Sequence, residues 1–220
     1  MSSYAVIDLE MCKVPKGVSS TYRARNEIIQ IGVVLLDEDL NIKDKFSTYV
    51  KPHFGWIDSF IKGLTGISYE LVKEAPEIKE AVTRFLEWLP DEEVTIVSWS
   101  MTDKNQLEKE LVLKNLSFEK LDTLYETWID CQELFGKKVD AGRKYSLKEA
   151  LIATDICGDE REHDGLSDAI NTALLFARIQ SGRLTFNRYY EVAMCDGKEE
   201  TLSVSLGELF KNLGTQLVSA

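Results

Sequence analysis

Hydrophobic residues change their spacing along the chain, and this spacing predicts the first elements. Residues 4–9 and 28–36 form nearly continuous apolar runs rich in Val and Ile, which predict strands covered on both faces. Residues 46–50 alternate between apolar and polar before Pro52 and predict a third strand. The three strands in succession predict a meander that opens an α/β sheet.

Beyond this meander the apolar spacing becomes helical. A short helix is predicted around Ile57, Phe60, Ile61 and Leu64, and a longer one over residues 78–89, starting near Pro76. Three elements are then expected in turn: a buried strand over 94–97, an amphipathic helix over 103–113 and a fifth strand over 124–129.

Two further helices complete the predicted α/β domain. Ser146 and Glu149 have the spacing of a capping box that opens a helix over 146–153. The last helix covers residues 166–180 and is expected to stop at Gly182. The order of elements predicts an α/β fold with a five-stranded mixed sheet flanked by helices. Residues 1–185 are interpreted as one domain, and 186–220 as an appendage of unknown role packed on it.

The charge of the chain limits how it would bind nucleic acid. There are 26 Lys and Arg against 37 Asp and Glu, so the net charge is −11. Binding of long nucleic acid through electrostatics alone is disfavoured, because that affinity comes from basic residues. Binding through metal ions held by carboxylates is still compatible with this charge. The four cysteines form no CxxC pair, which argues against a zinc site or a disulfide framework.

The sequence also predicts where in the cell the protein is located. No apolar run approaches the roughly 20 residues of a membrane span. The first residues do not resemble a secretory signal, so we expect a cytoplasmic protein that does not interact with membranes.

Asp8 and Glu10 are the most unusual polar residues, because they end an apolar strand. Residues two apart on a strand face the same side, so both carboxylates should lie at one spot on the sheet edge where α/β ligand sites occur. Two adjacent anions repel each other unless a proton or cation intervenes, and a divalent metal ion would serve. The alternative is that the strand simply ends at Asp8 and both acids are solvated.

Three more residues are candidates for the same site. Asp103 follows the fourth strand, although an acid in the first turn of a helix is also favoured by the helix dipole alone. His163 and Asp168 flank the start of the last helix. A loop histidine is usually just solvated, but near a metal ion a neutral imidazole can take a proton from bound water.

Together these segments resemble the DEDDh 3′-to-5′ exonucleases, the DnaQ-like group of the ribonuclease H-like fold. The resemblance rests on Asp8-x-Glu10, on Asp103 after the fourth strand and on His163-x(4)-Asp168, and it covers about residues 4–180. The residues before Asp103, Ser98-Trp99-Ser100-Met101-Thr102, are more similar to the RNA-trimming branch, which includes KapD-like bacterial proteins, than to polymerase proofreading subunits.

This resemblance implies a mechanism and a set of roles. Two Mg²⁺ ions, with Mn²⁺ as a substitute, would be held by Asp8, which bridges both, and by Glu10, Asp103 and Asp168. His163 would be the general base. The implied reaction is hydrolysis of single-stranded nucleic acid, RNA favoured, from its 3′ end, with release of nucleoside 5′-monophosphates. DNA proofreading and a non-catalytic regulator of the same fold are the alternatives.

The resemblance also implies where the substrate would bind. The segment Leu64, Thr65, Gly66 and Ile67 is similar to the stretch with which this family holds the terminal nucleotide, although a helix that ends at a glycine turn explains it equally well. Trp99, and with it Phe54 and Trp56, are candidate stacking surfaces for bases, with packing in the core as the commoner alternative. The appendage 186–220 is a possible contact for a protein partner.

Overall fold

A computed structural model of the protein describes residues 3–139, 143–158, 161 and 163–187. The chain separates into two units, Met1–Thr185 and Phe186–Ala220. From residue 188 onward the second unit lies outside the described residues, so the packing of the appendage and its contact with a partner stay predictions.

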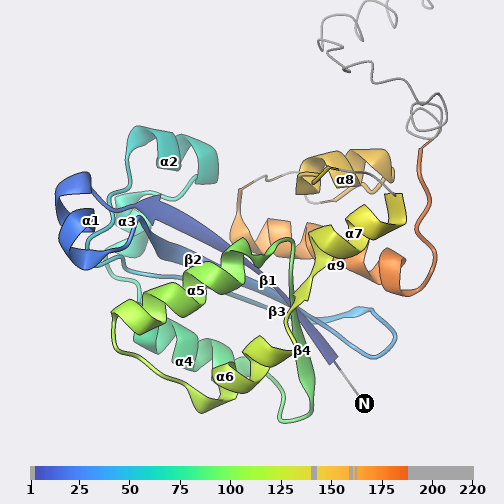
Figure 1. The fold of residues 1–220 in the computed structure, drawn as a ribbon, viewed down its shortest axis with the longest axis horizontal. Helices are drawn as coiled ribbons and strands as arrows, with labels where there is room; N and C mark the ends of the chain where they lie inside the picture. Colours follow the sequence, from blue (N-terminus) through green and yellow to red (C-terminus); the bar gives the residue numbers. More distant parts are fainter. Residues whose placement is uncertain (1–2, 140–142, 159–160, 162, 188–220) are drawn as a thin grey trace, which may run out of the picture. The chain divides into compact units, whose positions relative to one another are not determined.

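Five strands form one mixed sheet, as the sequence predicts (Figure 1). The central strand β1 is antiparallel to β2 and parallel to β4. The outer strands continue this pattern, since β3 is antiparallel to β2 and β5 is parallel to β4. In the sheet order β3-β2-β1-β4-β5, the bounds are β1 Ser3–Lys13, β2 Asn26–Leu36, β3 Ile42–Tyr49, β4 Val94–Ser98 and β5 Ile129–Asp130.

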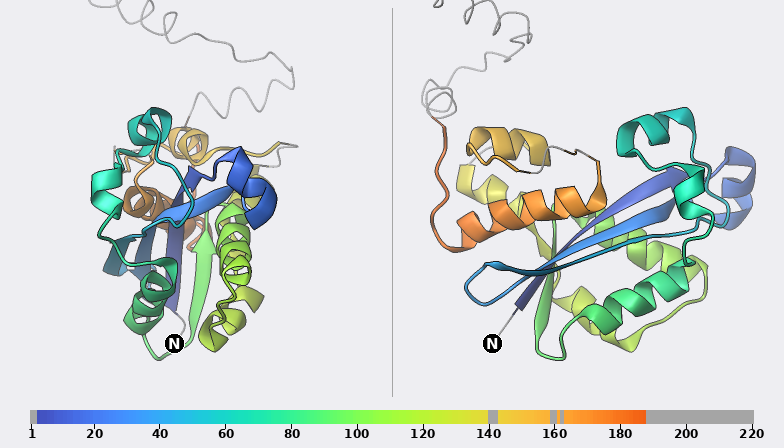
Figure 2. Two further views of the ribbon diagram at one scale, coloured as in Figure 1. Left: turned by 90° about the vertical axis from the view of Figure 1, so that its left-hand side faces the viewer. Right: turned by 180° about the vertical axis from the view of Figure 1, so that it is seen from behind.

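Helices cover both faces of this sheet (Figure 2). On one face lie α4 Ile78–Trp88, α5 Met101–Leu113 and α6 Glu119–Glu126. On the other lies α9 Gly165–Gln180, which contacts the three strands of the meander and is flanked by α7 Cys131–Val139 and α8 Leu147–Ala153. Beyond the tip of β1 are the short helices α1 Lys16–Tyr22, α2 Ser59–Thr65 and α3 Tyr69–Val72.

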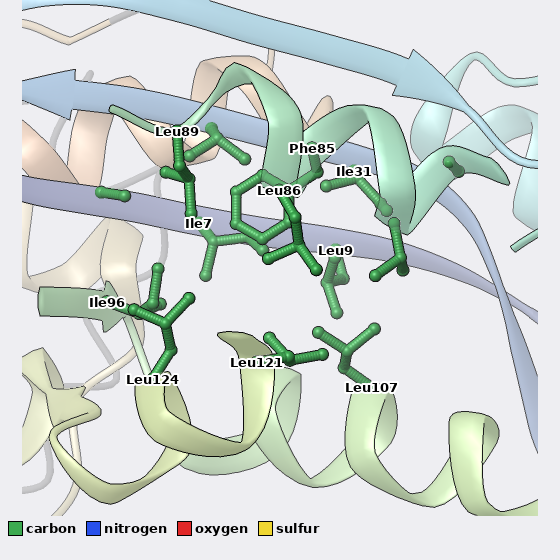
Figure 3. Close-up of a cluster of buried hydrophobic side chains, with 14 of the residues drawn as sticks. Ile7, Leu9, Ile31, Phe85, Leu86, Leu89, Ile96, Leu107, Leu121 and Leu124 are labelled. Carbon is green, nitrogen blue, oxygen red and sulfur yellow. The ribbon is translucent and has the colours of Figure 1, made fainter. Parts of the chain in front are cut away.

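The two faces of β1 pack against different layers of helices. Ile7 and Leu9 point into the hydrophobic core with residues of α4, α5 and α6, among them Phe85 (Figure 3). Residues of even number point to α9, where the ring of Tyr4 meets that of Phe176 edge-on with centroids 5.0 Å apart. Because side chains alternate along a strand, Asp8 and Glu10 also face α9.

Local sequence rules hold at the two predicted helix ends. The Ser146 hydroxyl accepts a hydrogen bond from the Glu149 N–H, and the Glu149 carboxylate accepts one from the Ser146 N–H at 2.8 Å. These are the reciprocal bonds of a capping box. After α9, Gly182 adopts a left-handed φ of 67°, which ends the helix as predicted.

The predicted fifth strand over 124–129 is wrong. Residues 119–126 form helix α6, and only Ile129–Asp130 pair with β4. Leu121, Leu124 and Trp128 are buried at intervals of three and four, so the apolar period in this stretch is helical. Helices α1, α3 and α7 are not predicted by the sequence either. Among the described residues, no helix combines the length and apolarity needed to cross a membrane.

Candidate active site

The acidic segment of β1 lies where the sheet is open on one side. The pairing of β1 with β4 ends at Val6 and Val97, so Asp8 and Glu10 are paired only with β2. The first turn of α5 occupies the vacant side, where the Leu9 N–H donates to the Asp103 carboxylate at 3.2 Å. A third carboxylate thus reaches the same edge of β1.

The start of α9 lies directly on β1 and β2. A Cβ atom at Gly32 would come within 2.2 Å of the Gly165 carbonyl carbon, so only glycine allows this approach. The Gly165 N–H donates to the side-chain carbonyl of Gln30 at 3.1 Å. Asp164 caps the helix by accepting from the Ser167 N–H at 3.1 Å. These contacts fix the first turn of α9 over Asp8 and Glu10.

His163 and Asp168 are brought together by the turn that precedes this helix. His163 has a left-handed φ of 59°, and its backbone N–H donates to the Asp168 carboxylate at 3.2 Å. Glu10, His163 and Asp168 each offer a ligand atom within 4.8 Å of the other two. Asp8 and Asp103 lie outside this triad, but the charge of Asp103 acts on Glu10, and the charges of Glu10 and Asp168 act on Asp8.

Burial and mutual repulsion disfavour the ionised form of these acids. Burial raises the pKa of Asp8 well above its ordinary value, and the charges of Asp103, Asp168 and Glu10 raise it further. The pKa of Glu10 rises to about 8 through burial, with Asp168 and Asp103 adding to the effect. Burial likewise raises the pKa of Asp103 to about 7, although the hydrogen bond from the Leu9 N–H opposes it.

A divalent cation fits this donor set. Carboxylate oxygens are the ligands that Mg²⁺ and Mn²⁺ prefer, and two positive charges would relieve the repulsion that raises the pKa values. The structure thus groups the four predicted acids and His163 at the edge of β1, beside the start of α9. Their individual roles as metal ligands or base are proposals.

The predicted substrate segment divides into two parts. Helix α2 ends at Gly66, whose φ of 72° is left-handed, and Leu64 and Gly66 are exposed. Thr65 and Ile67 are buried. The Thr65 hydroxyl accepts from the Ile67 N–H at 3.0 Å and donates to the Ile61 carbonyl at 2.9 Å. Only Leu64 and Gly66 are open to a ligand.

The aromatic candidates also differ in exposure. Trp99 is only 9% exposed and packs near Phe135, with ring centroids 6.1 Å apart, so its surroundings favour a packing role. Trp56 is 67% exposed. Phe60 is 61% exposed, and the Lys13 ammonium lies 5.3 Å from its ring centroid. The sequence interpretation grouped Phe60 with the apolar face of a helix, because spacing alone does not distinguish an exposed aromatic residue from a buried one.

The mixed sheet and the carboxylates at the edge of β1 define a ribonuclease H-like α/β protein with an acidic, cation-binding type of site. The exonuclease family model RNase_T matches residues 5–176, and the chain belongs to this family. Members of the family depend on divalent metal ions. The predicted membership is confirmed.

Individual relatives agree with this assignment. The chain is 30% identical to 3′-5′ exoribonuclease 1 of Rattus norvegicus over 70% of its own length, but it covers only 47% of that protein. It is 32% identical to the DNA polymerase III subunit epsilon of Aquifex aeolicus, with 80% of each chain covered. A crystal structure of the nuclease domain of 3′hExo, a DEDDh family member, bound to rAMP has the same fold (TM-score 0.69, 23% identity, 84% of this chain and 96% of that chain).

Proposed function

We propose that the protein is a metal-dependent 3′-to-5′ exonuclease that acts on single-stranded nucleic acid, RNA in preference to DNA, and releases nucleoside 5′-monophosphates. The observation that carries this proposal is the grouping of Glu10, His163 and Asp168 within 4.8 Å, beside Asp8 and Asp103, in a chain of the exonuclease family. The membrane-free, cytoplasmic location expected from the sequence stays a prediction.

The carboxylates hold the cations in this proposal. The charges of Asp103, Asp168 and Glu10 all act on Asp8, which supports its assignment as the residue that would be shared by two ions. Bound Mg²⁺, or Mn²⁺ in its place, supplies activation of a water molecule and neutralisation of the leaving oxygen. Glu10 and Asp168 would help to hold one ion, and Asp103 would contribute directly or through water.

His163 is proposed as the general base. Its imidazole lies within 4.8 Å of the Glu10 and Asp168 oxygens, so it is close to the place where an attacking water would be held. The left-handed turn and the bond of its N–H to Asp168 fix the backbone from which the ring projects. His163 takes the proton of the water as the phosphodiester is attacked.

The surface around α2 is proposed to bind the 3′ end of the strand. Leu64 and Gly66 are exposed at the end of α2, and Gly66 allows the backbone to approach the terminal sugar closely. Trp56 and Phe60 present exposed rings near Lys13, an arrangement suited to stacked bases and a phosphate. Thr65 and Ile67 shape this segment from within, and Trp99 is not assigned a contact with substrate.

One assay separates the candidate activities. Matched single-stranded RNA and DNA, labelled at the 5′ end, are incubated with Mg²⁺, with Mn²⁺ or with a chelator. We expect progressive shortening of RNA from its 3′ end, faster than of DNA, and none with chelator. Faster DNA shortening would favour the proofreading alternative, which the similarity to a DNA polymerase subunit supports. No metal-dependent shortening of either strand would favour a non-catalytic regulator.

A further inference from the structure

A buried charged network lies behind the proposed substrate surface. The side chain of Glu27, at the start of β2, is completely buried and forms an ion pair with Lys114 of the α5 C-terminus at 2.9 Å. Lys114 also pairs with Glu110 at 2.9 Å, and Glu110 accepts a hydrogen bond from the Ile28 N–H at 2.9 Å. None of these groups belongs to the acidic cluster around Asp8.

The second oxygen of Glu27 holds a loop that precedes α2. This oxygen accepts hydrogen bonds from the backbone N–H groups of Phe54 at 2.6 Å and Gly55 at 2.5 Å. The next residue, Trp56, donates its N–H to the Lys13 carbonyl at the end of β1 at 2.9 Å. Residues 54–56 are thereby fixed to β1 and β2 at three successive backbone N–H groups.

The fit of this loop leaves no spare room. A Cβ atom at Gly55 would lie 2.2 Å from the Cys12 sulfur and 3.2 Å from the Glu27 carboxylate. Burial acts to raise the pKa of Glu27, but the hydrogen bonds from Lys114 and from the Phe54 N–H outweigh it and lower that pKa. Glu27 therefore stays ionised at neutral pH, and charge-assisted bonds of this kind are stronger than neutral ones.

The loop presents its side chains beside α2. Trp56 is largely exposed and forms an isolated β-bridge with Lys13. The Lys13 ammonium in turn lies over the ring of Phe60. The position of Trp56 relative to Phe60 and Lys13 therefore depends on how residues 54–56 are attached to the sheet.

We propose that Glu27 is a positioning residue for nucleic-acid binding, which fixes residues 54–56 so that Trp56 lies beside Lys13 and Phe60 as a stacking surface. This inference rests on the proposed function, since it assumes a single-stranded nucleic acid as ligand. A purely stabilising role explains the network less well, because buried ion pairs contribute little net stability compared with apolar residues of similar volume.

Two charge-neutralising variants, Glu27→Gln and the matched control Glu110→Gln, test the proposal. Each removes one carboxylate and leaves Lys114 paired with the other, but only Glu27 touches the loop. We expect Glu27→Gln to speed hydrogen exchange in a peptide covering residues 51–58. It should also weaken binding of a fluorescent single-stranded RNA, measured by anisotropy with Ca²⁺ in place of Mg²⁺, about tenfold, the scale of one lost base stack. Glu110→Gln should stay within about twofold of wild type in both measurements.

Hydrolysis of a small substrate tests the proposed function independently of the positioning role of Glu27. A mononucleotide p-nitrophenyl ester reaches the acidic cluster and the end of α2 at Leu64 and Gly66 but carries no second base for the Trp56 surface, so its hydrolysis by Glu27→Gln should match that of wild type. If wild type does not hydrolyse the ester or RNA, the proposed function fails, while a selective loss of RNA binding in Glu27→Gln would still support the positioning role.

Equal RNA binding by wild type and Glu27→Gln, equal weakening by both variants, or no RNA binding at all would overturn the positioning role. If Glu27→Gln does not fold, Gly55→Ala displaces the loop without changing a charge, and it should weaken RNA binding to a similar degree. Unchanged RNA binding in Gly55→Ala would then overturn the proposal.

Discussion

At the scale of single residues, the main feature is the crowding of carboxylates at the edge of β1. Burial raises the pKa of Asp8, and the charges of four other acids raise it further. A group in this position is unfavourable for the empty protein and favourable once a cation is bound. Its removal should therefore have opposite effects on stability and on activity.

Asp8→Asn should abolish hydrolysis of RNA and leave the protein folded. In chelator at pH 8 the melting temperature of the variant should exceed that of wild type, because folding no longer buries a carboxyl group whose ionised form is disfavoured there. Activity assays and thermal unfolding measure the two effects. Retained hydrolysis would remove Asp8 from the proposed metal site.

His163→Ala should slow the chemical step by roughly 10²–10⁴-fold and leave RNA binding nearly unchanged, since a general base acts in the transition state. Single-turnover rates at saturating RNA give the first quantity and anisotropy with Ca²⁺ gives the second. A loss confined to binding would contradict the assignment of His163 as the base.

The sequence predicts part of this site for clear physical reasons. The side-chain alternation of a strand is fixed, so Asp8 and Glu10 are expected on one face from their spacing alone. The approach of His163 to Asp168 depends on a left-handed turn of a non-glycine residue, which spacing does not reveal. The anchoring role inferred for Glu27 also requires the fold, since its partners are 27 and 87 residues away along the chain.

At the scale of elements, the site depends on how closely α9 approaches β2. Gly32 and Gly165 lie in contact through their backbones, and Gln30 accepts a hydrogen bond from the first N–H of the helix. The helix that carries Asp168 is therefore positioned by direct backbone contact with β2 and by one hydrogen bond to the Gln30 side chain.

Gly32→Ala should destabilise the protein by about 1–3 kcal/mol, the usual cost of overpacking, and should reduce activity by displacing the start of α9. Urea unfolding measures the stability. Gly136→Ala is the matched control, because a Cβ atom there meets nothing within 4 Å and alanine is the better helix former. If both variants were equally stable, the close contact at Gly32 would be unimportant.

The elements themselves were predictable where one period dominates. The apolar runs of β1 and β2 and the amphipathic pattern of α4 lead to correct elements. The stretch before β5 misled the prediction, because Leu124 and Ile129 fit a strand if Leu121 is left out of the pattern. Helix α1, with the sequence KGVSSTY, offers no apolar period from which it could be found.

At the scale of the whole molecule, the net charge of −11 and the acidic cluster make stability depend on pH and on metal ions. The pKa values of Asp8, Glu10 and Asp103 are raised in the folded protein, so the folded state binds more protons than the unfolded state at intermediate pH. The free energy of unfolding therefore falls as the pH rises through this range.

In chelator, the melting temperature should decrease between about pH 4 and pH 8, where the unfolded acids are ionised and Glu10 is still titrating in the folded protein. Millimolar Mg²⁺ or Mn²⁺ should raise the melting temperature, more at pH 8 than at pH 5, because the cations compete with protons for the same oxygens. Thermal unfolding in the four combinations of pH and metal tests this. No shift with either metal at pH 8 would count against a cation site.

The alternation of β1 also has a consequence for folding. A displacement of β1 by one residue against β2 would exchange its two faces and place Asp8 and Glu10 beside Ile31 and Phe85. Burying an unpaired carboxylate among aliphatic and aromatic side chains costs much free energy. A misaligned intermediate would therefore be unstable and would not accumulate. The residues that make the empty site costly thus also select the correct alignment of the central strand while the chain folds.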